Sequence, residues 1–134
     1  MAHHVRVRDF MTKDPLTLRE DDLLRQAVEV VMVRRIRHIP VLERDRFVGF
    51  ISDRDIARII AETGPEWPAR TVADVGPAKV PVLRPRDSLA RAAELMRSQK
   101  LMALPIMSRD GLLVSLLTAT DLLNALVESQ TVLA

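Results

Sequence analysis

The stretch that decides the fold occurs twice, as Gly49-Phe50-Ile51-Ser52-Asp53-Arg54-Asp55 and as Ser115-Leu116-Leu117-Thr118-Ala119-Thr120-Asp121. In each copy a short apolar run ends in a hydroxyl residue, and a carboxylate follows three positions later. This spacing is typical of a helix start, where the hydroxyl accepts backbone N–H bonds and the helix dipole favours the acid. Both copies therefore predict a strand that leads directly into a helix.

The same positions also suit a nucleotide. The start of a helix offers free N–H groups to a phosphate. A carboxylate can accept hydrogen bonds from both vicinal hydroxyls of a ribose, and a hydroxyl or Arg54 can add a contact to a phosphate. A helix start can be capped and still face a ligand, so the structural and the ligand-binding interpretations are compatible.

A repeat extends outward from these stretches. A shift of 65 residues superposes residues 7–48 on residues 72–113. The identical pairs include Asp9 and Asp74, Asp22 and Asp87, Leu24 and Leu89, Ala27 and Ala92, and Pro40 and Pro105. One extra residue in the second hairpin changes the shift to 66, at a turn that tolerates an insertion. Self-similarity in one register indicates two copies of one supersecondary unit.

Each copy predicts the order β-α-β-β-α. The first helix of each copy has apolar residues at helical spacing, and Asp22 or Asp87 is expected to cap it. Strands are expected at 16–18, 39–42 and 47–51 in the first copy, and at 80–83, 104–107 and 112–117 in the second. The second helices carry the apolar residues Ile56, Ile59 and Ile60, or Leu122, Leu123, Leu126 and Val127.

The predicted fold class is α+β, with two β-α-β-β-α units related by a pseudo-twofold and their sheets packed together. The first unit is expected at residues 5–63, a linker with one glycine and two prolines at 64–71, and the second unit at 72–128. A copy of about 60 residues buries little surface, so we expect the two copies to pack as one module.

Composition excludes several classes of function. The chain has 134 residues, 48% of them apolar and 28% charged, with a net charge of +2 and no cysteine. The absence of cysteine excludes zinc ribbons, thiol catalysis and disulfide frameworks. A mixed-sign surface with only 3% aromatic residues argues against binding to nucleic acid. Charges interrupt the apolar stretches, so we expect no membrane span and a cytoplasmic protein. His3 and His4 beside Met1 are either native or derived from a tag.

The repeated pattern resembles a tandem pair of cystathionine-β-synthase (CBS) domains. The likeness spans residues 5–128 and rests on Arg37-His38-Ile39-Pro40-Val41 and on the two stretches quoted above. It implies a regulatory module that binds adenosine nucleotides, S-adenosylmethionine or dinucleotides in two clefts between the units. It also implies that ribose is bound by Ser52 and Asp55 in one cleft and by Thr118 and Asp121 in the other. The second copy departs from the pattern, because Ser115 replaces glycine and Thr120 stands where the first copy has Arg54.

The resemblance further implies that each cleft takes residues from both copies. Asp55 would face Lys79, Val80 and Ala103. Asp121 would face Asp14, Pro15, Leu16, Arg37 and His38. Phosphates would then be bound by Arg37 and His38 in one cleft, and by Arg54 with Lys79 nearby in the other. The basic run 34–38 is explained equally well as a solvated helix end.

The alternatives to a ligand-binding module are an enzyme and a dimerisation scaffold. An enzyme is disfavoured, because Asp53 and Asp55 do not face each other on a helix and no activated nucleophile, glycine-rich phosphate loop or metal site is visible. A dimerisation scaffold without a ligand is the more serious alternative. We expect a stand-alone ligand sensor that acts through an unidentified effector protein and forms a homodimer through its apolar second helices.

Overall fold

The computed structural model describes residues 5–128 and consists of two compact units. The central unit is Leu16–Lys79, and the terminal unit combines Met1–Pro15 with Val80–Ala134. Each unit has a three-stranded sheet and two helices, so the chain is a mixed α/β protein with the duplicated architecture that the sequence predicts. No helix within residues 5–128 is long and apolar enough to cross a membrane.

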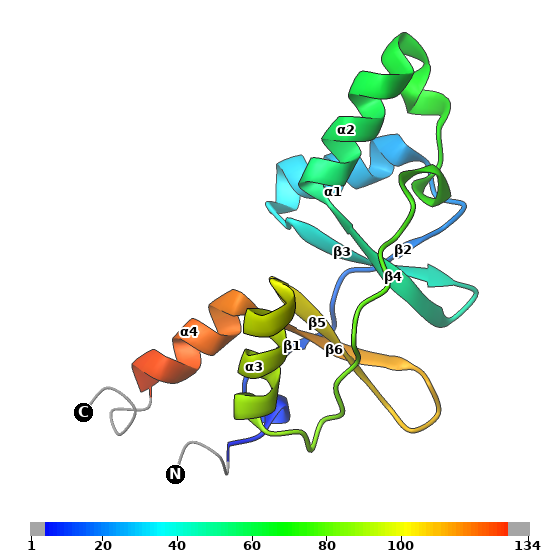
Figure 1. Cartoon of the computed structure of the whole chain (residues 1–134). Helices are drawn as coiled ribbons and strands as arrows, with labels where there is room; N and C mark the ends of the chain where they lie inside the picture. The colour runs from blue at the N-terminus through cyan, green and yellow to red at the C-terminus, as the bar shows by residue number, and fades with distance from the viewer. Residues whose placement is uncertain (1–4, 129–134) are drawn as a thin grey trace. The chain divides into compact units, whose positions relative to one another are not determined.

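The central unit has the strand order β2-β3-β4. Its elements are β2 (Leu18–Arg19), α1 (Leu24–Arg34), β3 (His38–Glu43), β4 (Arg46–Ser52) and α2 (Asp53–Thr63). β2 is parallel to β3, and β3 and β4 form an antiparallel hairpin. Ile39, Val41 and Ile51 are fully buried, and both helices pack on this face of the sheet (Figure 1). Apolar residues at every second strand position therefore form the core, as the alternation of side chains in a strand requires.

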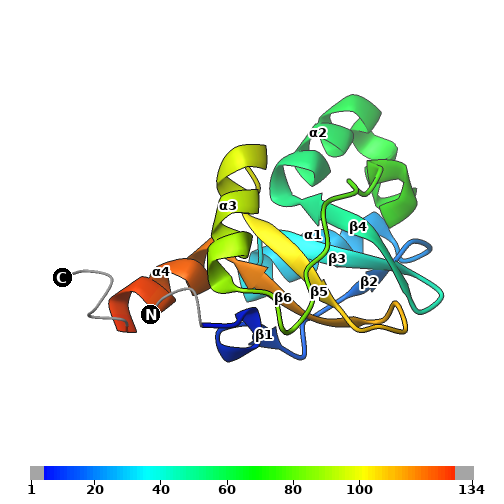
Figure 2. The same cartoon turned by 60° about the horizontal axis from the view of Figure 1, so that its bottom comes forward.

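The terminal unit has the strand order β1-β6-β5. Its elements are β1 (Thr12–Lys13), α3 (Leu89–Gln99), β5 (Ala103–Met107), β6 (Leu113–Thr118) and α4 (Ala119–Glu128). β1 comes from the start of the chain and lies antiparallel to β6 (Figure 2). Leu104, Ile106 and Leu117 form its core together with Val7, which is also fully buried. Both ends of the chain are therefore needed to build this unit.

Equivalent backbone hydrogen bonds support the first helix of each unit. Leu24 N–H donates to the carbonyl of Arg70, and Leu89 N–H donates to the carbonyl of Val5, both at 2.8 Å. The segment that precedes each repeated copy thus packs against the other copy. Packing divides the chain differently from the sequence repeat, and the domain bounds 5–63 and 72–128 stay a prediction.

Two local expectations are wrong. Asp22 and Asp87 do not cap the first helices; their Oδ2 atoms accept the N–H groups of Arg19 and Arg84 at 2.8 Å. Each carboxylate closes the turn before the helix, because the donor three residues earlier is within reach. Ser88 instead caps α3, with its Oγ accepting Arg91 N–H at 3.0 Å.

The strand expected at residues 80–83 is also absent from the named strands of the described chain. A single parallel bridge joins Leu83 to Ile106 at the place where the repeat predicts a strand. Pro81 lacks an N–H group and cannot contribute a donor to such a ladder, which limits the pairing.

Gly49 marks a close approach between β4 and the segment that follows α2. Phe50 and Ala78 exchange two backbone hydrogen bonds, of 3.1 and 2.9 Å. Gly49 has a φ of +151°, and a Cβ atom there would lie 2.5 Å from the carbonyl oxygen of Ala78. In the terminal unit Ser115 pairs with Lys13, and its buried Oγ has no hydrogen-bond partner within residues 5–128. The replacement of glycine by Ser115 therefore affects the contact between β6 and β1 and leaves the hydroxyl–acid pair unchanged.

Candidate functional site

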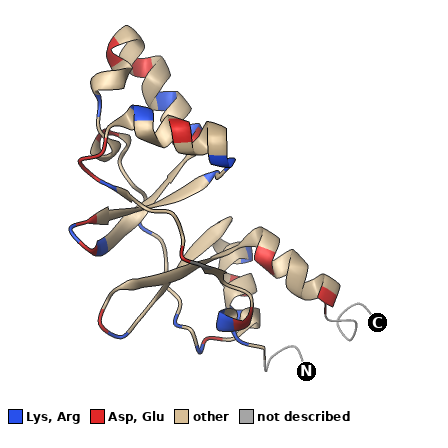
Figure 3. Cartoon of the chain, turned by 180° about the vertical axis from the view of Figure 1, so that it is seen from behind, with Lys and Arg blue, Asp and Glu red and all other residues tan. Residues whose placement is uncertain are grey.

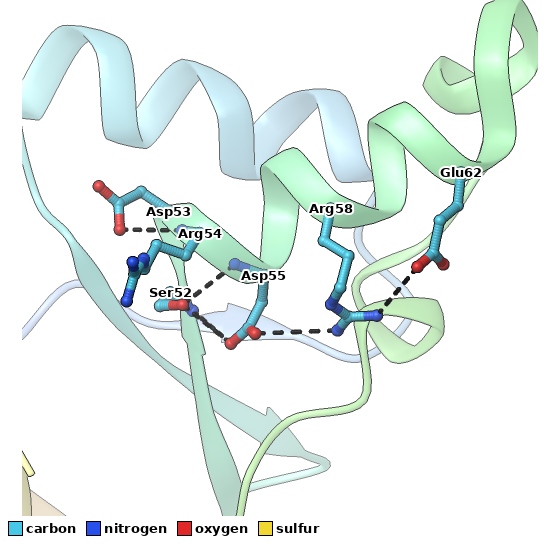
Figure 4. Close-up of polar contacts among 6 residues, drawn as sticks. All are labelled: Ser52, Asp53, Arg54, Asp55, Arg58 and Glu62. Atoms are coloured by element: carbon cyan, nitrogen blue, oxygen red, sulfur yellow. Dashed lines mark hydrogen bonds and ion pairs between the residues drawn. The ribbon is translucent and has the colours of Figure 1, made fainter. Parts of the chain in front are cut away.

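The candidate site of the central unit lies where β4 passes directly into α2. Asp55 N–H donates to Ser52 Oγ at 3.1 Å, and Ser52 Oγ donates to Asp55 Oδ2 at 2.9 Å (Figure 4). Ser52 N–H points to the same Oδ2 atom at 3.4 Å. These contacts fix the carboxylate at the first turn of the helix, where the helix dipole favours a negative charge.

Charged side chains surround this junction. Asp55 Oδ1 lies 3.8 Å from an Arg58 nitrogen, and Arg58 also lies 3.8 Å from Glu62 further along α2. Arg54 is exposed and turns to the side of the helix that carries Asp53 (Figure 4). Exposed ion pairs of this length contribute little to stability, so Arg58 can leave Asp55 at small cost.

The start of β3 lies beside the same junction. Asp53 N–H donates to the carbonyl of Arg37 at 3.0 Å, and His38 pairs with Ser52 in the hairpin register. Directly opposed residues of an antiparallel pair place their side chains on the same face of the sheet. His38 and Arg37 therefore adjoin the Ser52–Asp55 pair within the central unit.

Burial lowers the pKa of His38 from 6.5; the nearby Asp53 and Asp55 oppose this effect, and Arg37 adds to it. The unfolded chain therefore binds a proton at a higher pH than the folded chain. Stability is complete above the unfolded pKa and declines as the pH falls toward the lowered folded value.

We expect His38→Gln to reduce this loss of stability. Urea unfolding of the wild type and the variant should be compared at about pH 7.5 and about pH 5, on either side of the ordinary histidine pKa. The variant should lose less free energy of unfolding between the two values. An equal loss in both proteins would contradict the burial effect.

The terminal unit has an equivalent junction between β6 and α4. Thr118 N–H donates to Asp121 Oδ2 at 2.8 Å, and Asp121 N–H donates to Thr118 Oγ1 at 3.2 Å. Ala119 N–H donates to the carbonyl of Met102 at 2.9 Å, and Ala103 pairs with Thr118 in the register. A further donor, Thr12 Oγ1, lies 3.3 Å from Asp121 Oδ2. Sequence reasoning missed Thr12, because no local pattern links residues that are 109 positions apart.

The structure brings together part of the predicted site in each unit. In the central unit Leu16, Arg37, His38, Ser52, Arg54 and Asp55 lie at one end of the sheet. In the terminal unit Ala103, Thr118, Thr120 and Asp121 lie at one end, and Val80 precedes the bridge to β5. Ala78 pairs antiparallel with Phe50, and β1 pairs antiparallel with β6, so the chain runs away from each junction after these pairings. The side away from the junctions therefore holds Lys79 in the central unit and Asp14 and Pro15 in the terminal unit. Which residues of the two units share a cleft stays a prediction.

The hydroxyl–acid geometry alone does not define a site. Thr71 and Asp74 repeat it at the start of the 3-10 helix η4 (Val72–Val75), with Thr71 N–H donating to Asp74 Oδ2 at 3.0 Å. Among residues 5–128 no three His, Asp or Glu side chains form a group that could hold a metal ion. His3 and His4 lie outside the described residues. The family to which the chain belongs therefore decides how the two junctions are interpreted.

The family model for the CBS domain matches residues 7–62 and again residues 72–128. This chain belongs to the CBS-domain family. The two matches contain the two junctions, so Ser52 and Asp55 lie in one CBS domain and Thr118 and Asp121 lie in the other.

Solved structures share the fold over nearly the whole of this chain. An acetoin utilization protein (AcuB) of Vibrio cholerae has a TM-score of 0.85 and 24% identity, with 96% of this chain and 95% of that chain covered. CBSX2 of Arabidopsis thaliana, in a structure with AMP, has a TM-score of 0.81 and 25% identity, with 94% of this chain and 98% of that chain covered.

CBS pairs also occur inside larger enzymes. A homoserine O-acetyltransferase of Methanohalophilus mahii is 30% identical over 125 residues, which are 92% of this chain and 25% of that protein. The chain spans about a quarter of the length of the homoserine O-acetyltransferases that it matches. The match therefore concerns their CBS portion.

Proposed function

We propose that this protein is a regulatory CBS pair that binds an adenosine-containing ligand of the AMP, ADP, ATP or S-adenosylmethionine type. The ribose hydroxyls would donate to Asp55 in one CBS domain and to Asp121 in the other. The single observation that carries the proposal is the repetition of the hydroxyl–acid pair at the strand-to-helix junction of both CBS domains.

Three features support this reading. Each carboxylate is half-buried and accepts hydrogen bonds without a ligand, Asp55 from Ser52 and Asp121 from Thr118 and Thr12, so it is oriented before a ligand arrives. The helix starts offer N–H groups and a favourable dipole to an anion. The similar protein CBSX2 was crystallised with AMP.

We propose that cationic side chains receive the phosphates. Arg37, His38 and Arg54 lie around the central junction, and Lys79 is exposed beyond the bridge to β4. A guanidinium can bind a phosphate through two parallel hydrogen bonds. The two clefts expected between the units stay a prediction, as does the cytoplasmic location.

A panel of melting curves tests the proposal. A ligand that binds the native state alone raises its stability by about 2.7 kcal/mol at a concentration of 100 times Kd. We expect AMP, ATP or S-adenosylmethionine to raise Tm by several degrees, whereas inosine monophosphate, which lacks the 6-amino group of adenine, should raise it less. An unchanged Tm with every adenosine compound would leave the scaffold function as the better explanation.

The proposed role is regulatory and not catalytic. Binding would change the state of the protein and transmit a signal through an effector protein, which requires that the partner distinguish the two states. The matched enzymes are consistent with this role, because there the CBS pair is a minor part of a longer chain.

We also propose that the protein forms a homodimer, and the structure restricts which helix can provide the interface. On α2, Ile56 is buried, while Ile59, Ile60 and the linker residue Trp67 pack against the core of the central unit. On α4, Leu123, Leu126 and Val127 remain 60%, 39% and 71% exposed. Figure 3 shows many charged residues on α2 and few on α4. We therefore propose that α4, and not both second helices, provides the dimer interface.

An apolar groove adjoins this face of α4. It has a volume of about 650 Å³ and lies between α3 and α4, with Phe10, Leu89, Leu122 and Leu126 among its lining residues. A second copy of the chain could bury these side chains, which would otherwise remain in contact with water. The same face also supports the alternative function, a dimerisation scaffold without a ligand.

Sedimentation velocity at micromolar concentration tests the dimer. The wild type should sediment as a dimer, and the double variant Leu123→Glu, Leu126→Glu should sediment as a monomer because two charges would be buried. Met32→Glu is the matched control, since Met32 is a 73% exposed apolar residue of the central unit. A monomeric wild type, or a double variant that remains dimeric, would contradict the prediction.

A further inference from the structure

Two segments that lie far apart in the sequence hold the carboxylate of Asp121. Its Oδ2 atom accepts Thr118 N–H at 2.8 Å from its own helix start and lies 3.3 Å from the hydroxyl of Thr12 in β1. The pairing of Thr12 with Leu116 places β1 beside the end of β6, and this pairing brings the hydroxyl to the junction. Within residues 5–128, Oδ1 of Asp121 has no hydrogen bond or ion pair.

The equivalent carboxylate in the central unit is held in another way. Asp55 Oδ2 accepts the hydroxyl of Ser52 at 2.9 Å, and Oδ1 lies 3.8 Å from Arg58. The repeat places Pro77 at the position of Thr12 and Asn124 at the position of Arg58. Proline offers no donor to Asp55, and asparagine offers no charge to Asp121. Thr12 thus supplies in the terminal unit a contact that local residues supply in the central unit.

We infer that Thr12 is a positioning residue for the ligand site of the terminal unit, an inference that rests on the proposed function. The torsion that orients an aspartate carboxylate is broad, so a single donor from its own helix start leaves the group free to turn. The Thr12 hydroxyl supplies a second donor to Oδ2 and leaves Oδ1 available to the ribose hydroxyls. Thr12 is then part of the ligand site that contains Asp121, although in the sequence it lies within the first CBS match, residues 7–62.

Calorimetric titration with AMP in an Asp55→Ala background tests this role, because the remaining heat reports on the terminal unit. Thr12→Val keeps the β-branched shape and removes the donor. We expect it to weaken AMP binding about three- to tenfold, less than the loss of a direct contact to the ligand, because Thr12 acts through Asp121. Thr12→Ser retains the donor and should restore the affinity to within about twofold. A packing role for Thr12 would not produce this rescue.

Thr71→Val is the matched control. Thr71 Oγ1 lies 3.4 Å from Asp74 Oδ2 at the start of η4, so the variant removes a similar hydroxyl contact away from both junctions. Its AMP affinity should equal that of the Asp55→Ala parent. Equal AMP affinity of the Thr12→Val variant and its parent would overturn the positioning role while leaving the proposed function intact. A wild-type protein that binds no AMP would overturn the proposed function itself.

Discussion

The double variant Asp55→Ala, Asp121→Ala is expected to lose binding of AMP at concentrations that saturate the wild type. Each carboxylate would accept charge-assisted hydrogen bonds from a ribose, and removal of such a contact weakens binding by about tenfold to a hundredfold. Each single variant should therefore lose one binding event, and the double variant should lose both. Isothermal calorimetry measures the affinity and the number of sites together.

The fold should survive these substitutions. Ser52 and Thr118 still accept the N–H groups at position 55 and 121, since those bonds use the hydroxyl and the backbone. Asp74→Ala is the matched control, because Asp74 accepts Thr71 N–H at 3.0 Å in the same geometry away from the two junctions. Undiminished AMP binding by the double variant, with both proteins folded, would contradict the assignment of the two acids.

Gly49→Ala is expected to destabilise the protein more than any other alanine substitution of a glycine in the described chain. A side chain at a φ of +151° is strained, and its Cβ would lie 2.5 Å from the Ala78 carbonyl oxygen. Backbone strain alone costs about 1–3 kcal/mol. Displacement of Ala78 would also disrupt its two hydrogen bonds with Phe50. Urea unfolding should show a total loss of roughly 2–4 kcal/mol.

Gly76→Ala separates strain from steric contact. Gly76 has a φ of +75°, but a Cβ there meets no atom within 4 Å. The variant should therefore cost about 1–2 kcal/mol, the penalty for a side chain in the left-handed region. The close approach of Ala78 would be contradicted if Gly49→Ala destabilised the protein no more than Gly76→Ala.

The order of elements could be predicted from the sequence because the repeat supplies the same pattern twice. The paired identities and the alternation of Ile39, Val41 and Ile51 indicate equivalent sheets, and the structure confirms them. Local rules were less reliable at helix starts, because a carboxylate such as Asp87 can accept N–H groups either from the turn before a helix or from the helix start. The nearer turn, closed by the N–H of Arg84, takes the carboxylate.

Part of the site could also be predicted from local spacing. Ser52 with Asp55 and Thr118 with Asp121 act as reciprocal pairs within one helix turn, so four residues of sequence contain the whole geometry. Thr12 could not be found in this way. Its contact depends on the register between a two-residue strand and β6, which tertiary packing determines.

The exposure of the apolar residues on the second helices could not be predicted from the sequence. Periodicity predicts that α2 and α4 each have a buried face, but it does not reveal that Trp67 packs against the core of the central unit. Leu123 and Leu126 remain exposed on α4. The residues of the proposed dimer interface can therefore be selected from their exposure in the structure, whereas the sequence treats both helices alike.

A crystal structure of the protein grown with AMP tests the central claim most directly. The account predicts AMP at the strand-to-helix junctions, with ribose 2′- and 3′-hydroxyl oxygens at about 2.5–3.0 Å from the carboxylates of Asp55 and Asp121. The account would be contradicted by AMP bound elsewhere, or by junctions without nucleotide at a concentration of AMP well above that of the protein.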